Sequence, residues 1–147
     1  MKTSDVPIRA ATTDRAVIEQ RIRHMYERRT ANDPVGIYEF AAPDIVYRSS
    51  TYRVYPFHAS CNGRDACIEM SRAINIFYEN LGSDIRDLVI DGDRVAFRRV
   101  ARLRNRGSGK TYSVNVCNFF RFRDGQVIEI EEYPDTQAVS LIENANI

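Results

Sequence analysis

Three polar residues interrupt apolar strand patterns in the second half of the chain: Arg99, Asn118 and Glu132. Successive strand side chains point to opposite faces, so residues two apart share a face. At that spacing the neighbours of all three are mainly Val, Ile, Leu, Phe and Ala. A charge or an amide on such a face must be paired or line a cavity, because burial without a partner is costly. We therefore expect the three side chains to point inward and converge.

These three side chains would bring different chemistry to one site. Arg99 is a permanent cation that binds anions, and the Asn118 amide can donate to a developing oxyanion. Glu132 can act as a general acid or base; burial would raise its pKa, whereas contact with Arg99 would lower it. Two interpretations stay open: a polar cluster inside a ligand cavity, and a buried Arg99–Glu132 ion pair, with Asn118 satisfied by backbone, that serves packing alone.

Five further residues are candidates for contact with a ligand. Tyr26, on the apolar stripe of an expected helix, can donate a phenolic hydrogen bond into a cavity or pack in the core. Tyr47 shares an expected strand face with apolar neighbours. Phe97 lies on the same strand face as Arg99, and Phe120 lies on the same strand face as Asn118. His58 lies in an aromatic-rich stretch that would cover a pocket mouth or, alternatively, be ordinary surface.

Helices are expected in the first half of the chain. N-cap candidates, apolar residues at helical spacing and glycine or proline boundaries define them. The first helix begins at Thr13 and Asp14 and carries a stripe of Ile18, Ile22, Met25 and Tyr26. The second runs from Asp33-Pro34 to about Pro43, and the third runs from Gly63 to Leu81-Gly82-Ser83. A strand over Ile45 to Ser50 lies between the second and third helices.

The second half of the chain predicts an antiparallel meander. Turn signals occur at Asp91-Gly92-Asp93, Arg106-Gly107-Ser108-Gly109 and Asp124-Gly125, between strands near 86–90, 95–104, 112–123 and 127–133. On the expected strand near 127–133, Ile128 and Ile130 lie on the same face as Glu132. Helices followed by such strands indicate an α+β fold in which the N-terminal helices pack on one face of a curved sheet. We expect one domain over 13–147 and an N-terminal extension over 1–12.

The composition limits the classes of function. The 147 residues carry 21 Lys or Arg and 20 Asp or Glu, a net charge of +1, which argues against a nucleic-acid partner. No apolar run approaches the ~18 residues of a membrane span, and the start lacks a signal-peptide core. We therefore expect a cytoplasmic protein with no membrane partner. Three scattered cysteines and only two histidines, His24 and His58, predict no metal site and no cofactor.

The opposite faces of the same strands predict self-association. Arg98, Arg102 and Arg104 alternate on this outer face, which is best explained as solvated or dimer-facing surface. Cys117 and Phe119 fall on it as well. An apolar patch on an exposed sheet face is typical of an interface, so we expect a homodimer through the outer face of the sheet.

Several segments carry a family resemblance: Ala31-Asn32-Asp33-Pro34, Phe40-Ala41-Ala42-Pro43-Asp44, Gly63-Arg64-Asp65-Ala66, Asp91-Gly92-Asp93-Arg94-Val95, Phe120-Arg121-Phe122-Arg123-Asp124-Gly125-Gln126-Val127 and Glu132-Tyr133-Pro134-Asp135. With them the chain resembles, over about residues 13–143, the SnoaL-like and ketosteroid-isomerase-like proteins of the nuclear-transport-factor-2-like superfamily. The resemblance implies a cone-shaped curved antiparallel sheet, with the N-terminal helices on its concave face, around a small-molecule pocket. Because this fold hosts many activities, the resemblance alone selects none.

The resemblance transfers catalytic positions only in part. Asn118 stands where ketosteroid isomerases have an oxyanion-hole aspartic acid, and their oxyanion-hole tyrosine falls near Met25 and Tyr26. Ser49 takes the place of their general-base aspartate and cannot act as that base. Arg99 and Glu132 match the arginine and last acid of limonene-epoxide-hydrolase-like members, whereas Ala101 replaces the acid between them.

Residues and resemblance together predict a cofactor-independent isomerase, cyclase or dehydratase that acts on a small, mostly apolar compound with a carbonyl or hydroxyl group. Glu132 would be the acid or base, Asn118 and Tyr47 would hold the oxygen, and Arg99 would set the charge of Glu132 or bind substrate. The alternative is a non-catalytic module of the same fold that binds a small ligand or dimerises.

Overall fold

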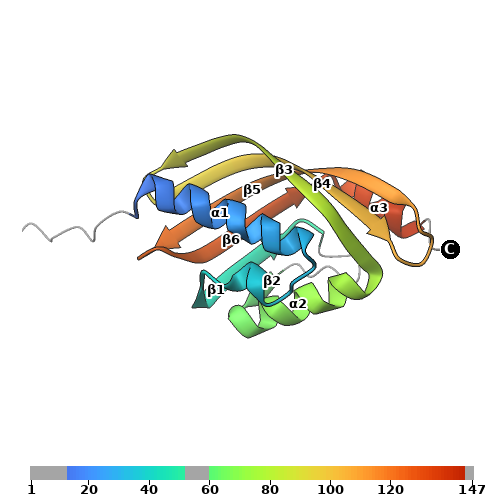
Figure 1. Cartoon of the computed structure of the whole chain (residues 1–147), viewed down its shortest axis with the longest axis horizontal. Helices are drawn as coiled ribbons and strands as arrows, with labels where there is room; N and C mark the ends of the chain where they lie inside the picture. Colours follow the sequence, from blue (N-terminus) through green and yellow to red (C-terminus); the bar gives the residue numbers. More distant parts are fainter. Residues whose placement is uncertain (1–12, 52–59, 145–147) are drawn as a thin grey trace, which may run out of the picture.

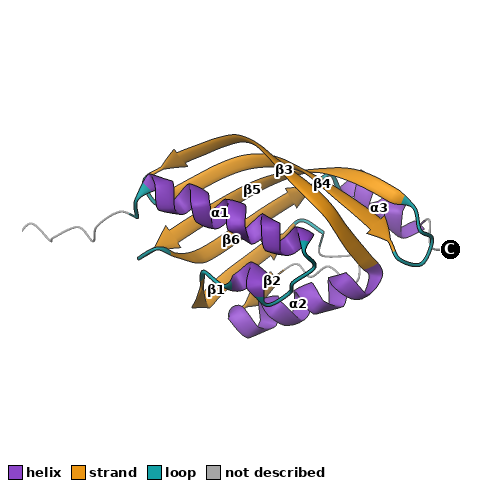
Figure 2. Cartoon of the chain, viewed as in Figure 1, coloured by secondary structure: helices purple, strands orange, loops and turns teal. Residues whose placement is uncertain are grey.

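The computed structural model describes residues 13–51 and 60–144; the predicted N-terminal extension, residues 1–12, lies outside this range. The elements in chain order are α1 (Arg15–Thr30), the short 3-10 helix η1 (Gly36–Tyr38), β1 (Ala41–Ser49), β2 (Ser60–Asn62), α2 (Arg64–Phe77), β3 (Tyr78–Asp91), β4 (Arg94–Asn105), β5 (Thr111–Arg123), β6 (Gln126–Pro134) and α3 (Thr136–Asn144). They form an α+β fold in which α1 and α2 lie on one face of a curved, unclosed sheet (Figures 1 and 2). The predicted fold class is confirmed.

The sheet brings strands from both halves of the chain together. Its order is β2-β1-β6-β5-β4-β3. The pairs β3–β4, β4–β5 and β5–β6 are antiparallel, as the turn signals predicted, and β1 pairs with β2 antiparallel and with β6 parallel. As a result, β4, β5, β6 and β1 are successive neighbours, and each carries one of the predicted polar site residues.

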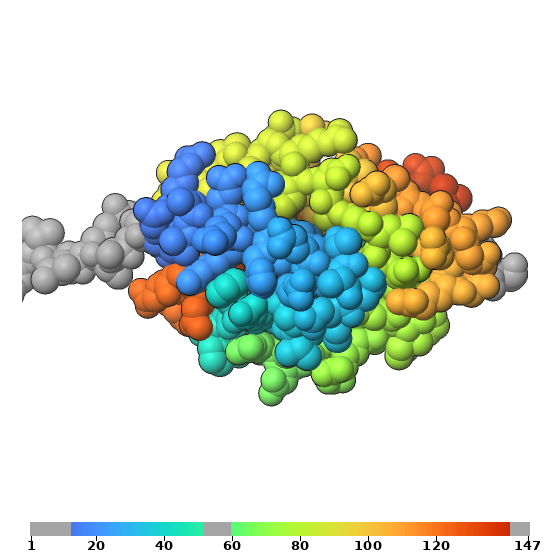
Figure 3. Space-filling view, viewed as in Figure 1, coloured from blue at the N-terminus to red at the C-terminus, as the bar shows by residue number. Residues whose placement is uncertain are grey.

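The helix α1 forms where its cap and stripe predicted it. The Asp14 side chain accepts hydrogen bonds from the backbone N–H groups of Ala16 and Val17, which would otherwise lack partners at a helix start. The buried residues of α1 are Ile18, Ile22, Met25 and Tyr26. In the space-filling view α1, the segment through η1 and α2 form a continuous surface over the sheet (Figure 3).

The predicted phase of the long strands is confirmed around the polar residues. Arg99 in β4, Asn118 in β5 and Glu132 in β6 are buried together with their apolar neighbours two residues away. In β6 the expectation for Ile128 is wrong, because Val127 is buried while Ile128 is only half-buried. Arg121 pairs with Glu129 whereas Phe122 pairs with Val127, so Ile128 is the extra residue of a β-bulge.

Several predicted boundaries differ from the structure. The second helix is a single 3-10 turn, and β1 begins at Ala41 rather than Ile45, because Ala41 already pairs with Val127 of β6. The helix α2 ends at Phe77, ahead of the predicted Leu81-Gly82-Ser83, and β3 begins at once. Residues 78–83 pair with β4, and this long-range pairing overrides the helical pattern.

Candidate functional site

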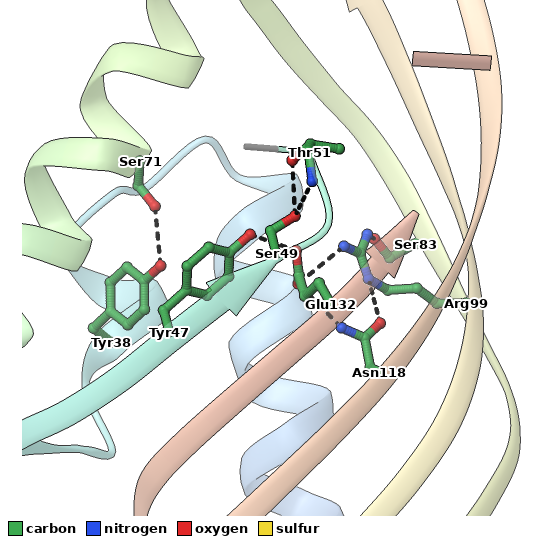
Figure 4. Close-up of polar contacts among 9 residues, drawn as sticks. All are labelled: Tyr38, Tyr47, Ser49, Thr51, Ser71, Ser83, Arg99, Asn118 and Glu132. Carbon is green, nitrogen blue, oxygen red and sulfur yellow. Dashed lines mark hydrogen bonds and ion pairs between the residues drawn. The ribbon is translucent and has the colours of Figure 1, made fainter. Parts of the chain in front are cut away.

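The neighbouring strands β1, β6, β5 and β4 each contribute one residue to a polar cluster of Tyr47, Glu132, Asn118 and Arg99 (Figure 4). Glu132 Oε1 accepts hydrogen bonds from Arg99 Nη2 at 3.3 Å and from Asn118 Nδ2 at 3.1 Å. Glu132 Oε2 accepts one from the Tyr47 hydroxyl at 2.9 Å. Arg99 Nε donates to Asn118 Oδ1 at 3.1 Å. The predicted convergence of the three polar residues is confirmed, and it includes the Arg99–Glu132 ion pair.

The strand register explains this geometry. Asn118 of β5 lies directly opposite Glu132 of β6, and Ser49 of β1 lies opposite Glu132 on its other side. The exposed fraction is 2% for Arg99, 0% for Asn118 and 9% for Glu132. In such a dry environment an ion pair is held by geometry and added hydrogen bonds, because each charge has lost its water.

The environment keeps Glu132 ionised. Burial alone would raise its pKa, but the positive charges of Arg99 and Arg29, with hydrogen bonds from Tyr47 and Asn118, outweigh burial and lower the pKa below the ordinary 4.5. Of the two effects considered from the sequence, contact with arginine therefore prevails. At neutral pH Glu132 is a carboxylate, which can accept a proton but has none to give.

Tyr47 of the cluster and Tyr26 beside it both stay protonated. Burial raises the pKa of Tyr26 to about 12, and burial followed by the charge of Glu132 raises the pKa of Tyr47 well above its ordinary value. The Tyr26 ring lies under the Arg99 guanidinium, with Cζ 4.8 Å from the ring centroid, a cation–π arrangement. The Tyr26 hydroxyl is buried; the nearby charge of Arg99 opposes the rise in its pKa, but no well-formed hydrogen bond joins the hydroxyl to any described residue.

A cavity of about 50 Å³ adjoins the cluster between the helices and the sheet. It offers room for roughly one or two water molecules. The residues that line it are Met25, Tyr26, Arg29, Ile37, Tyr38, Tyr47, Ser49, Thr51, Met70, Ile74, Arg99, Ala101, Leu103, Val114, Val116, Ile130, Glu132, Pro134 and Val139. Its wall is therefore mostly apolar with a few polar groups, which is the usual composition of a ligand site.

The other predicted site residues occupy different places. Asn118 is not part of the cavity wall, because its amide is engaged with Glu132 and Arg99. Phe97 packs edge-to-face on Tyr26 with centroids 5.7 Å apart and contacts Phe120 at 5.4 Å, so both phenylalanines support the wall from behind. His58 lies outside the described residues.

The structure adds lining residues that the sequence analysis missed. Arg29 of α1 lies three residues after Tyr26 and seven after Ile22, so helical periodicity would have placed a charge on the buried stripe. The Tyr38 hydroxyl lies 3.5 Å from Ser71 Oγ. Tyr38 follows no regular pattern in the sequence, since it belongs to a single 3-10 turn.

Residues 13–51 and 60–144 contain neither a metal-binding cluster nor a membrane-spanning helix. No three His, Cys, Asp or Glu side chains of this part of the chain gather as metal ligands would, and the absence of a metal or cofactor stays a prediction. None of its helices has the length and apolar character required to cross a bilayer.

Comparison with known proteins identifies the family. The sequence profile of the SnoaL-like domain matches residues 22–130, which is most of the chain, so the predicted resemblance is confirmed. No curated protein matches the chain.

Solved structures confirm the fold. An NTF2-like protein of unknown function from Burkholderia pseudomallei has a TM-score of 0.78 at 19% identity, with 86% of this chain and 97% of that chain covered. TerC, co-crystallised with polyporic acid, has a TM-score of 0.76 at 18% identity, covering 87% and 98%. An LEH-like epoxide hydrolase of M. tuberculosis has a TM-score of 0.70 at 15% identity, covering 89% and 92%. At these identities the similarity concerns the fold alone.

Proposed function

We propose that this chain, which belongs to the SnoaL-like domain family, is a cofactor-independent enzyme that moves a proton on a small carbonyl or hydroxyl compound. The observation that carries the proposal is the pairing of two groups in one cavity wall. Glu132 is an ionised carboxylate, and Tyr26 is a protonated phenol without a partner among the described residues. One group accepts a proton and the other stabilises the oxyanion that forms.

The proton transfer uses a lone pair of Glu132 and the O–H donor of Tyr26. From the described residues, Glu132 Oε2 accepts a single hydrogen bond, donated by Tyr47, and keeps a lone pair for a substrate proton. When that proton leaves a carbon next to a carbonyl, the C–H electron pair moves into an enolate, whose oxygen accepts a hydrogen bond from Tyr26. Return of the proton from Glu132 to a different carbon completes an isomerisation.

The remaining polar residues hold the base in place. Asn118 and Arg99 fix the orientation of the Glu132 carboxylate and keep it ionised. We therefore assign Asn118 a positioning role, since its amide has no contact with the cavity. Tyr47 donates to the same carboxylate and lines the cavity, so it is available to either a substrate oxygen or Glu132.

The small cavity limits the substrate. A space of about 50 Å³ takes only a compound of a few heavy atoms unless wall residues move. Met25 and Met70 are the wall residues that adapt most readily, because an unbranched thioether changes rotamer at low cost. The co-crystal of TerC with polyporic acid supports the idea that this fold holds organic compounds.

The second candidate function is a non-catalytic binding module. Three internal hydrogen bonds already satisfy the Glu132 carboxylate, and its lowered pKa makes it a weak base. A weak carboxylate base suffices where donors stabilise the developing anion, so the two candidates differ in whether the cavity wall performs this stabilisation.

Proton exchange into solvent deuterium tests the enzyme directly. The protein is incubated in deuterated water with acetone, pyruvate and small cyclic ketones, and loss of the proton signal next to the carbonyl is followed by NMR. Glu132→Asp is the preferred variant, since it keeps a counter-charge for buried Arg99 but withdraws the carboxylate. Glu129→Gln, on the same strand with its partners Arg48 and Arg121 at the surface, is the matched control.

We expect the wild type and Glu129→Gln to accelerate exchange of at least one compound, and Glu132→Asp to lose about 100-fold or more of that rate. Equal rates in Glu132→Asp and the wild type would refute the role of Glu132. No acceleration with any compound would favour the binding module. The cytoplasmic location, the lack of a nucleic-acid partner and the dimer stay predictions.

A further inference from the structure

The charges around the cavity do not balance. Among the residues that the structure describes, Arg29, Arg99 and Glu132 are the arginine and carboxylate residues in its wall. Arg99 and Glu132 neutralise each other through their ion pair at 3.3 Å. This leaves Arg29 as one positive charge in excess at the wall.

Arg29 has no partner in the part of the chain that the structure describes. It is half-buried, it forms no ion pair there, and its Nε is buried without a hydrogen-bond acceptor. Asp33, the acidic residue beside it in a smaller adjoining cavity, accepts from the backbone N–H groups of Val35 and Gly36 and lies 4.0 Å from Arg28. The local acid is therefore engaged elsewhere.

The field of Arg29 reaches across the cavity. Its charge opposes the rise in pKa that burial causes at Tyr38 and Tyr47. At Glu132 it adds to the lowering by Arg99 that outweighs burial. A guanidinium in such a mostly apolar space binds a carboxylate better than a neutral carbonyl, because the planar fork matches two carboxylate oxygens and charge assists each hydrogen bond.

We infer that the cavity takes a small carboxylate-bearing compound, with its carboxylate at Arg29 and its carbonyl or hydroxyl group toward Tyr26 and Glu132. This direction follows because Arg99 is already paired with Glu132, which leaves Arg29 as the guanidinium available to the carboxylate of the ligand. This inference rests on the proposed function, because it names the substrate class for the same cavity. It adds a carboxylate to the mostly apolar carbonyl or hydroxyl compound that the sequence predicts.

Binding of an isosteric pair tests the inference without any turnover. Propionate and propionamide have nearly the same shape and differ in charge, and their affinities for the full chain are measured by titration of backbone amide signals in NMR. Arg29→Gln removes the charge, and Arg29→Lys keeps a charge without the planar fork. Arg72→Gln is the control, because Arg72 is an exposed helical arginine on α2 that pairs with Glu69.

We expect the wild type and Arg72→Gln to bind propionate at least about tenfold more tightly than propionamide, as one charge-assisted contact provides. The preference should vanish in Arg29→Gln and be reduced in Arg29→Lys. Equal affinities in the wild type, a preference that persists in Arg29→Gln, or no binding of propionate would each overturn the inference.

The outcome is separable from that of the proposed function. An Arg29-dependent preference for propionate without catalysed exchange would uphold the carboxylate site and reject the enzyme. Exchange that depends on Glu132, together with equal binding of propionate and propionamide, would uphold the enzyme and reject the carboxylate site.

Discussion

At the scale of single residues, Tyr47 and Tyr26 form a natural comparison. Both phenols are buried in the same cavity wall, but within the described part of the chain only Tyr47 has a hydrogen-bond partner, the Glu132 carboxylate. We expect Tyr47→Phe to lower the free energy of unfolding by about 1.5–3 kcal/mol, the range for hydrogen bonds to charged groups. Tyr26→Phe should be neutral or slightly stabilising, since it removes a hydroxyl without a partner. Urea denaturation measures both, and equal losses would contradict the assigned hydrogen bonds.

The lowered pKa of Glu132 predicts a pH-dependent contribution to stability. Its folded-state pKa lies below the ordinary 4.5, so the ionised form stabilises the fold above that value. The contribution is lost as the pH falls through the lower, folded-state pKa. The difference in unfolding free energy between the wild type and Glu132→Gln should therefore shrink between about pH 7 and about pH 3.

A control separates this effect from general acid unfolding. Glu129→Gln affects ion pairs at the surface and should cost less than about 1 kcal/mol across the same range. If the difference for Glu132→Gln stayed constant with pH, Glu132 would not have the lowered pKa assigned to it.

At the scale of elements, Asn32 joins the end of α1 to the start of β3. Its backbone has a φ of 56°, and its side-chain Oδ1 accepts from the Asn80 backbone N–H at 2.8 Å while its Nδ2 donates to the Asn80 carbonyl at 3.2 Å. Asn32→Ala should cost about 2 kcal/mol or more, from left-handed strain and lost hydrogen bonds.

Asn32→Gly separates these two contributions. Glycine tolerates the positive φ but cannot bond to Asn80, so this variant should be less destabilised than Asn32→Ala. Asn115→Ala, at an exposed position of β5, should change the unfolding free energy by less than about 0.5 kcal/mol. If Asn32→Ala were equally mild, the junction would be held by other contacts.

The sequence predicted elements whose determinants are local. The cap at Asp14, the turn at Asp124-Gly125 and the period-two burial around Arg99 are all readable within a few residues, and the structure confirms them. The end of α2 was misplaced because pairing with β4 and the contact between Asn32 and Asn80 decide it.

The candidate site was predictable to the same extent. Strand alternation placed Arg99, Asn118 and Glu132 together, since one phase governs each strand. Tyr38 could not be found in this way, because an irregular turn carries it. Helical periodicity could have found Arg29, but only the packing of α1 against the sheet shows that Arg29 has no partner among the described residues.

At the scale of the whole molecule, the outer face of the sheet carries an exposed aromatic pair. Phe119 and Tyr133 are 45% and 50% exposed, with ring centroids 6.0 Å apart. We expect this face to form a homodimer, and Phe119→Arg to shift the protein to a monomer in sedimentation analysis, because it places a charge in an apolar contact. Ile76→Arg, at an exposed position of α2, should leave the dimer intact. A wild-type monomer at micromolar concentration would contradict the prediction.

The four-strand polar cluster also favours one register of the sheet. If β6 paired with β5 one residue out of step, Glu132 would turn to the solvent and Arg99 would be enclosed without a counter-ion. The same slip would also turn the buried Ile130 to the solvent, so the apolar residues of β6 oppose it as well. The buried ion pair therefore adds to the free-energy difference between the native register and a register shifted by one residue.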